Sequence, residues 1–222
     1  MPVAYGRNVL EWVAMPPPVE RTVLLIRHSE RPSFDAVPFS EWDKVSLTER
    51  GVHAARDFGG LLARSAGGSK LRVYSWGQKR CVDTAEAIAK GAKDADCCAV
   101  EERALRLPSP IQNREKYDRT IQSASWEEVV LNWLGAGIEQ DIMVPINTYA
   151  PVIVRELLGA SVCGNREVAV VATHDLHIIP LLSHIFGAPI REVDYLDGLV
   201  IKVGPEQAHA AFSKMSKLLE AD

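Results

Sequence analysis

The sequence VLLIRHSERP, residues 23–32, carries the clearest structural signal in the chain. Its apolar run leads directly into Arg27 and His28 and stops at Pro32. A short, continuous apolar run is typical of a strand buried on both faces, as in a parallel sheet. Polar residues after such a strand lie at its carboxyl end, where open α/β sheets form their ligand crevice. His28, between Arg27 and Arg31, is therefore a candidate for chemistry on an anion; the alternative is a loop histidine among surface charges.

Strands and helices are predicted to alternate along the rest of the chain. Further strands are predicted over residues 71–75, 97–100, 167–172 and 199–203. Helices are predicted over residues 48–66, 81–90, 126–134, 147–158, 176–186 and 205–219. Thr48 is expected to cap the first of these helices, and Gly91 to end the second. This alternation indicates an α/β protein, a three-layer α/β/α sandwich with a mostly parallel central sheet.

Residues 1–222 are expected to form a single domain. The periodicity weakens over residues 103–146, which are too few for a core of their own. We therefore expect them to form a small inserted cap over the carboxyl edge of the sheet. The loop 33–45 carries Phe39 and Trp42, and it is expected either to wall a pocket or to cover the edge of the core.

The composition argues against several classes of protein. The net charge is −4 and no run is rich in lysine or arginine, so nucleic-acid binding is not expected. No apolar stretch approaches the roughly 18 residues that span a membrane, and the N-terminus lacks the pattern of a signal peptide. The four cysteines form no Cys-x-x-Cys pair, so neither a zinc site nor a disulfide framework is indicated. We expect a cytoplasmic protein, and the sequence carries no signal for its oligomeric state.

Three predicted strand ends carry side chains suited to phosphate chemistry. After the first strand come Arg27 and His28, Arg80 follows the second, and His174 and Asp175 follow the strand at 167–172. Guanidinium groups bind phosphate oxygens in pairs, and helix N-termini add N–H groups and a favourable dipole. A neutral imidazole can attack phosphorus, while a carboxylic acid can protonate the leaving oxygen. The set therefore favours phosphoryl transfer.

Four segments together resemble the histidine phosphatase superfamily, which includes phosphoglycerate mutases and histidine acid phosphatases. Leu25–Glu30 (LIRHSE) resembles its opening Arg-His-Gly motif, and Leu47–Gly51 (LTERG) its Leu-Thr-x-x-Gly helix start. Arg80–Ala85 (RCVDTA) is similar to its Arg-x-x-x-Thr-Ala element, and Thr173–Asp175 (THD) to the segment with its second histidine. The matches occur in family order. The resemblance implies a phosphoglycerate mutase-like fold.

The resemblance also implies roles for individual residues. His28 would form a phosphohistidine intermediate, and Arg27, Arg80 and His174 would bind the phosphoryl oxygens. No metal ion and no cofactor are expected, because the arginines and the histidine neutralise charge. The general acid is Asp175 if the chain follows the acid-phosphatase branch, which we favour. It is Glu101 or Glu102, placed after the third strand, if the chain follows the mutase-like branch.

Next to the nucleophile the sequence departs from the family pattern. Ser29 stands where the family has glycine, and Arg80 follows Ser75 by five residues instead of four, which predicts a one-residue bulge. Arg31 resembles an additional arginine of the acid-phosphatase branch. Ser29, Glu30 and Arg31 are therefore expected to bind substrate, although an acidic residue near a phosphate more often pairs with an arginine.

The expected activity is metal-independent hydrolysis of a phosphomonoester. The expected partner is a small phosphorylated metabolite or a phosphoprotein. Two alternatives remain open: a phosphoglycerate mutase-like phosphotransferase, and a phospho-ligand-binding protein of the same fold with weak catalysis.

Overall fold

A seven-stranded mixed sheet runs through the middle of the structure, a computed structural model that describes residues 5–15, 20–35, 37–159 and 163–219. The strands are β1 (Arg21–Arg27), β2 (Lys70–Ser75), β3 (Val100–Ala104), β4 (Glu167–Thr173), β5 (Gly198–Val203), β6 (Ala208–Phe212) and β7 (Met215–Leu219). The helices are α1 (Arg7–Ala14), the 3₁₀ helix η1 (Phe39–Lys44), α2 (Glu49–Ser65), α3 (Lys79–Asp94), α4 (Arg114–Ser123), α5 (Trp126–Leu134), α6 (Ile146–Leu158) and α7 (Asp175–Phe186).

The order of strands places β1 near the centre of the sheet, in the order β3-β2-β4-β1-β5-β6-β7. β1 pairs in parallel with β4 and antiparallel with β5. From β3 to β1 the neighbours are parallel, whereas β5, β6 and β7 are antiparallel. The expected α/β sandwich is confirmed, but the expectation of a mostly parallel sheet is only partly right.

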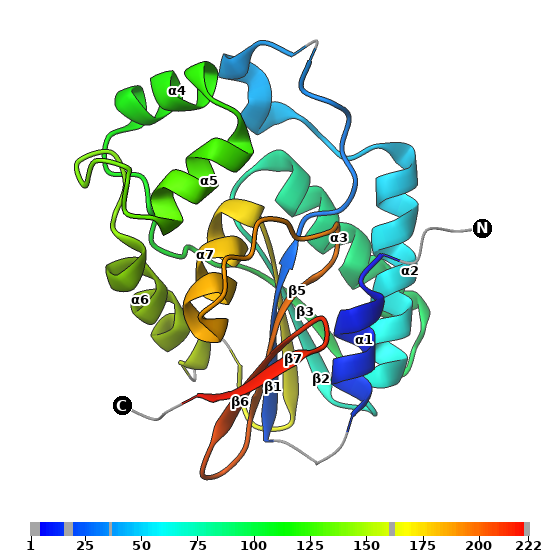
Figure 1. The fold of residues 1–222 in the computed structure, drawn as a ribbon. Coiled ribbons are helices and arrows are strands. Elements are labelled where there is room, and N and C mark those ends of the chain that lie inside the picture. Colours follow the sequence, from blue (N-terminus) through cyan, green and yellow to red (C-terminus); the bar gives the residue numbers. More distant parts are fainter. Residues whose placement is uncertain (1–4, 16–19, 36, 160–162, 220–222) are drawn as a thin grey trace.

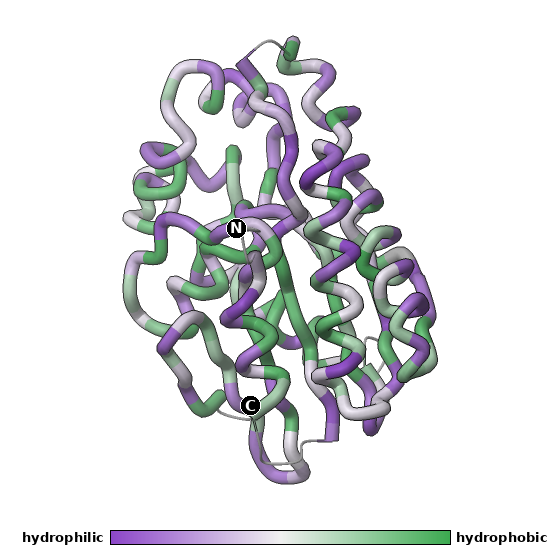
Figure 2. The backbone as a smooth tube through the Cα atoms, turned by 90° about the vertical axis from the view of Figure 1, so that its right-hand side faces the viewer, coloured by the Kyte–Doolittle hydropathy of each residue, from purple (hydrophilic) through white to green (hydrophobic). Residues whose placement is uncertain are grey.

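Alternating side chains of β1 reach two different hydrophobic layers. Val23 and Leu25 belong to the layer shared with α6 and α7, while Leu24 and Ile26 belong to the layer shared with α1, α2 and α3 (Figure 1). All four side chains are fully buried, and burial of each contributes about 1.5–3 kcal/mol. Figure 2 shows the hydrophobic stretches gathered along the central strands between the helices. This burial on both faces is why the run at residues 23–26 lacks polar residues.

The prediction of a final helix over residues 205–219 is wrong. These residues form the hairpin β6–β7, which continues the sheet from β5. Ser213 and Lys214 connect the strands, and Ser213 has a positive φ of 52°, as a tight hairpin turn requires. Ala, Lys, Leu and Met favour a helix locally, but backbone pairing of β6 with the edge of β5 that β1 leaves unpaired outweighs this weak preference.

The third strand lies further along the chain than predicted. It covers Val100–Ala104 instead of residues 97–100, so Glu101 and Glu102 lie within it. β3 is an edge strand, and edge strands tolerate charged side chains that a central strand excludes. The apolar pattern that identified the central strands was therefore missing here.

Gly91 does not end a helix, because α3 continues to Asp94. A Cβ atom at Gly91 would lie 1.8 Å from the backbone oxygen of Arg56 in α2. The glycine therefore allows the backbones of α2 and α3 to approach closely. Thr48 does cap α2 as expected, since its hydroxyl accepts from the N–H of Gly51 at 2.9 Å.

The helices α4 and α5 lie beyond the carboxyl ends of the parallel strands (Figure 1). Both fall within residues 103–146, the segment expected to form a cap; the boundaries of the cap and the single-domain division stay predictions. Within the described residues, no helix is long and apolar enough to cross a membrane.

Candidate active site

Two histidines meet where the parallel strands β1 and β4 end. His28 directly follows β1, and its backbone N–H donates to the carbonyl of Thr173, the last residue of β4, at 2.8 Å. His174 follows Thr173 and occupies the N-cap position of α7. The centroids of the two imidazole rings are 5.4 Å apart. The parallel pairing of β1 with β4 thus brings together residues that are far apart in the sequence.

The N-terminus of α2 holds the loop that follows His28. The backbone N–H of Thr48 donates to the carbonyl of Glu30 at 3.0 Å, and the hydroxyl of Ser29 donates to the carbonyl of Gly51 at 2.8 Å. A Cβ atom at Gly51 would lie 2.1 Å from the oxygen of Glu30, so only glycine fits. The threonine and the glycine of the Leu47–Gly51 motif therefore fix the position of the nucleophile loop.

Ser29 and Glu30 do not line the pocket beside His28. Ser29 is fully buried, and its backbone N–H donates to the hydroxyl of Thr84 at 2.9 Å. The carboxylate of Glu30 accepts from Tyr5 and Thr48 and pairs with Arg50. The hydrogen bond from Arg50 is the main cause of the lowered pKa of Glu30. The structure therefore places both side chains outside the pocket lining, where they anchor the loop.

The imidazole of His28 is neutral and presents a lone pair. Its Nδ1 lies 2.8 Å from the carbonyl oxygen of Ser29. A carbonyl only accepts, so Nδ1 carries the proton and Nε2 keeps the lone pair that a nucleophile needs. Burial lowers the pKa of His28 to about 3, and the charges of Arg80 and Arg27 act in the same direction. The ring therefore stays unprotonated at neutral pH.

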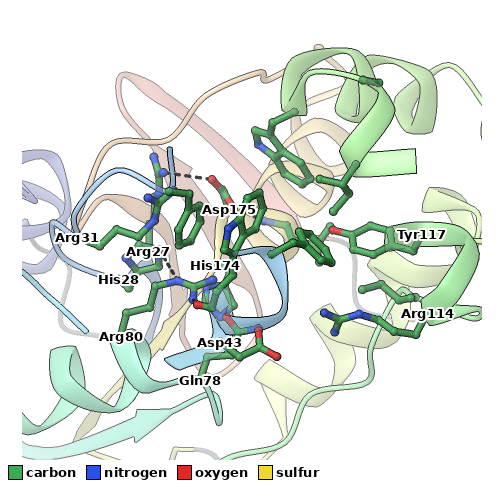
Figure 3. A pocket seen from close by; sticks show the side chains of 18 residues that line it. Arg27, His28, Arg31, Asp43, Gln78, Arg80, Arg114, Tyr117, His174 and Asp175 are labelled. Carbon is green, nitrogen blue, oxygen red and sulfur yellow. Dashed lines mark hydrogen bonds and ion pairs between the residues drawn. The ribbon is translucent and has the colours of Figure 1, made fainter. Parts of the chain in front are cut away.

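Two arginines flank His28 with defined orientations. The Nε of Arg80 donates to Nε2 of His28 at 3.3 Å, and its Nη1 donates to the carbonyl of Trp42 at 2.8 Å. Arg27 donates from Nη1 to the carbonyl of Val193 at 2.7 Å, while its buried Nε has no hydrogen-bond partner among the described residues. Backbone carbonyls thus hold both guanidinium groups, and Figure 3 shows Arg27 and Arg80 next to His28.

Arg31 also lines the pocket, and it lies against an aromatic ring. Its guanidinium carbon is 3.4 Å from the centroid of the Phe34 ring, and its Nη1 donates to the carbonyl of Pro32 at 2.7 Å. Burial lowers the pKa of Arg31 from its ordinary value, but an arginine remains charged at neutral pH. Arg31 is therefore placed to add positive charge at the rim of the site.

Asp175 is the first residue of α7 and faces Arg27. Its Oδ2 lies 3.3 Å from Nη2 of Arg27, and its Oδ1 accepts from the N–H of Leu176 at 3.0 Å. Behind it, Nε2 of His174 lies 3.3 Å from the sulfur of Cys81. Burial, followed by the charge of Arg80, holds the pKa of His174 well below its ordinary value.

The pocket joins six of the predicted residues in a cavity of about 400 Å³. Arg27, His28, Arg31, Arg80, His174 and Asp175 all line it. Glu101 and Glu102 do not: Glu101 pairs with Lys70 and Arg103, and Glu102 pairs with Lys93. The alternative general acids thus lie in ion pairs on β3, away from the pocket, which leaves Asp175 as the predicted acid that the structure places beside His28.

Several other residues line the pocket, and none of them was singled out as a site residue from its place in the sequence. They are Phe34, Asp43, Gln78, Ile111, Arg114, Tyr117, Ile121, Ala124, Trp126 and Leu176. Asp43 and Gln78 follow no strand directly, so the rule that located His28 and His174 does not reach them. Trp126, the first residue of the helix predicted over residues 126–134, borders the cavity. Among the described residues, no three His, Cys, Asp or Glu side chains are grouped so that they could hold a metal ion.

The fold and the pocket define a class of α/β sandwich proteins that gather histidines and arginines at the carboxyl edge of the sheet. Residues 23–106 match the model of the histidine phosphatase superfamily (branch 1), and this match includes His28 and Arg80. It confirms the resemblance that the sequence motifs indicated. Comparison with curated proteins gives no significant match in sequence.

Several solved structures share the fold of this chain. Bacillus stearothermophilus YhfR is similar over 86% of this chain and 96% of its own, with 18% identity and a TM-score of 0.54. A mycobacterial glucosyl-3-phosphoglycerate phosphatase, solved with VO3, is similar over 91% of this chain and 99% of its own, with 15% identity and a TM-score of 0.50. At these identities the comparison establishes the shared fold.

Proposed function

We propose that the protein is a phosphomonoester hydrolase that works through a phosphohistidine on His28. One observation carries the proposal: Nε2 of a neutral, buried His28 is unprotonated and accepts from Nε of Arg80 at 3.3 Å, within a pocket that Arg27 also lines. A neutral imidazole is the nucleophilic form, and guanidinium groups stabilise the charge on a transferring phosphoryl group. The match to the histidine phosphatase superfamily supports the same chemistry.

The reaction proceeds in two displacements. Nε2 of His28 attacks phosphorus, the bond from phosphorus to the ester oxygen breaks, and the leaving alcohol takes a proton from the carboxyl group of Asp175. Water then attacks the phosphohistidine and gives its proton to Asp175, which releases inorganic phosphate and restores His28. A bound phosphoryl dianion would compete with Asp175 for Arg27.

The direct test is release of phosphate from an aryl phosphate by the purified protein. We expect turnover that is unchanged by a chelator such as EDTA, since the arginines and His174 provide the charge stabilisation. Loss of activity in the chelator, restored by a divalent metal ion, would contradict the proposal. A phosphoglycerate substrate that gives an isomeric ester and no free phosphate would indicate a mutase instead.

Asp175→Asn is expected to slow hydrolysis most for esters with poor leaving groups. A general acid contributes about 10²–10⁴-fold, and it matters least when the leaving oxygen needs no proton. The variant should therefore lose about 100-fold or more in kcat with an alkyl phosphate, but much less with 4-nitrophenyl phosphate. Asp43→Asn is the matched control, because Asp43 is the other carboxylate of the pocket. If Asp43→Asn instead shows the larger loss of kcat with poor leaving groups, Asp43 is the general acid.

A further inference from the structure

The pocket has two halves of different chemistry. The half around His28 contains the arginines and histidines described above. The other half, called the distal half here, is formed by Phe34, Phe39, Trp42, Ile111, Tyr117, Ile121, Ala124, Trp126 and Leu176. All of these except Ala124 are large apolar or aromatic side chains. A phosphate needs only the first half, so the distal half is available to the rest of a substrate.

One wall of the distal half is a cluster of aromatic rings on the loop that follows β1. The rings of Phe34 and Trp42 are stacked, with centroids 4.2 Å apart and an interplanar angle of 7°. Phe39 packs against Trp42 at 4.7 Å. All three side chains are only half-buried. Phe34 is covered by Trp42 and by the guanidinium of Arg31, 3.4 Å from its centroid, so it supports the wall. Phe39 and Trp42 are the rings of this wall that are suited to contact a ligand.

The opposite wall comes from α4 and α5. Tyr117 and Ile121 are four residues apart on α4, so they share one face of that helix. Trp126 is the first residue of α5, which begins with a complete capping box between Ser125 and Glu128. This cap fixes the start of α5 and with it the backbone of Trp126. Figure 3 shows Tyr117 across the pocket from Arg27 and His28.

The charges around the distal half favour an apolar group there over a second anion. Arg114 borders it, but its Nε donates to Asp118 at 2.6 Å, so part of its charge is balanced. The carboxylate of Asp43 also lines the cavity and would repel an anion. The volume of about 400 Å³ lies within the range of roughly 300–1,000 Å³ that is usual for small-molecule pockets.

We propose that the distal half binds a planar apolar group, such as an aromatic ring, on a small phosphomonoester. This inference rests on the proposed phosphatase activity and adds the class of its substrate. The wall formed by Phe34, Phe39 and Trp42 and the wall from α4 and α5 hold the ring between them while the phosphoryl group reaches His28. Esters of short aliphatic alcohols fill only the polar half.

The test compares 2-phenylethyl phosphate with ethyl phosphate. Both esters release a primary alcohol of similar acidity, so the ratio of their kcat/KM values reports contacts of the ring and not the ease of bond cleavage. We expect a ratio of about tenfold or more, the usual discrimination of an apolar pocket. Equal kcat/KM for the two esters would overturn this inference and leave the phosphatase activity intact. No hydrolysis of either ester would contradict the proposed function as well.

Trp126→Ala and Trp12→Ala form the matched pair of variants. Trp126→Ala is expected to reduce the ratio about tenfold, because it removes one wall of the distal half. Trp12 lies on α1, where its Nε1 donates to the carbonyl of Ser213, so Trp12→Ala should keep the wild-type ratio. A ratio cancels any loss of folded protein. An unchanged ratio in Trp126→Ala would overturn the assignment.

A second substrate pair distinguishes a small ester from a protein. A phosphotyrosyl peptide and phenyl phosphate both release a phenol, so their leaving groups are matched. Similar kcat/KM values support a small-molecule substrate, because the peptide residues beyond the ring then add no favourable contacts. A preference of more than about tenfold for the peptide would overturn that part of the inference.

Discussion

The His28→Ala protein is expected to lose at least about 10⁴-fold in kcat/KM for any phosphomonoester. The change removes the nucleophile itself, and loss of a nucleophile costs up to about 10⁶-fold in enzymes that form covalent intermediates. Alanine fits the space, so the fold around Ser29 and Thr173 should persist. The measurement is initial-rate phosphate release at several ester concentrations. Rapid acid-free quenching and mass spectrometry should also show a phosphorylated His28 in the wild type alone.

His53→Ala is the control for this experiment. His53 is an exposed histidine of α2, outside the pocket, so its removal should leave the rate within about twofold. A His28→Ala protein with activity within tenfold of the wild type would rule out the phosphohistidine mechanism. The same result would make His174, the other histidine that lines the pocket, the candidate nucleophile.

Replacement of Arg80 is expected to have the second-largest effect. Arg80→Ala should lower kcat by about 10³-fold or more, since an arginine that stabilises a transferring phosphoryl group contributes roughly 10³–10⁵-fold. The effect should fall on kcat more than on KM, because charge builds up on the phosphoryl oxygens in the transition state. Arg80→Lys should recover only part of the rate, since an ammonium group keeps the charge but lacks the planar pair of donors.

Arg56→Ala is the matched control for Arg80→Ala. Arg56 is an exposed arginine of α2 that pairs with Asp94 of α3, outside the active-site pocket. We expect its replacement to change kcat by less than about twofold. Equal losses in the two variants would mean that Arg80 acts through general stability or net charge, and the proposed role beside His28 would then fail.

The sequence predicted the elements that bury apolar side chains on a regular pattern. Residues 126–134 form the predicted helix without any shift, because a capping box and an apolar face agree there. β1 and β4 were equally clear, since both are central strands with apolar side chains on two faces. The prediction failed for β3 and for β6–β7, where tertiary pairing decides the structure and local preference points elsewhere.

The residues of the candidate site also fall into two groups, those that local sequence could locate and those that only the folded chain brings together. The residues that directly follow central strands, such as His28 and His174, could be found because strand ends of a parallel sheet share one edge. The sequence does not show that the side chains of Ser29 and Glu30 turn toward α2, where the structure places them. Tyr117 and Trp126 lie on helices far along the chain, and only the folded arrangement of α4 and α5 brings them to the pocket. No spacing rule connects them to His28.

The position of β1 at the centre of the sheet determines which kind of unfolding displaces the nucleophile. β1 is hydrogen-bonded to β4 on one side and β5 on the other, and its apolar residues are fully buried. Amide hydrogens of such a strand exchange with solvent only when the whole domain opens, whereas edge strands and surface helices open locally at much lower cost. His28 is attached directly to this most protected element. The nucleophile therefore keeps its position through local fraying of β3 or β7, and it is displaced only by global unfolding.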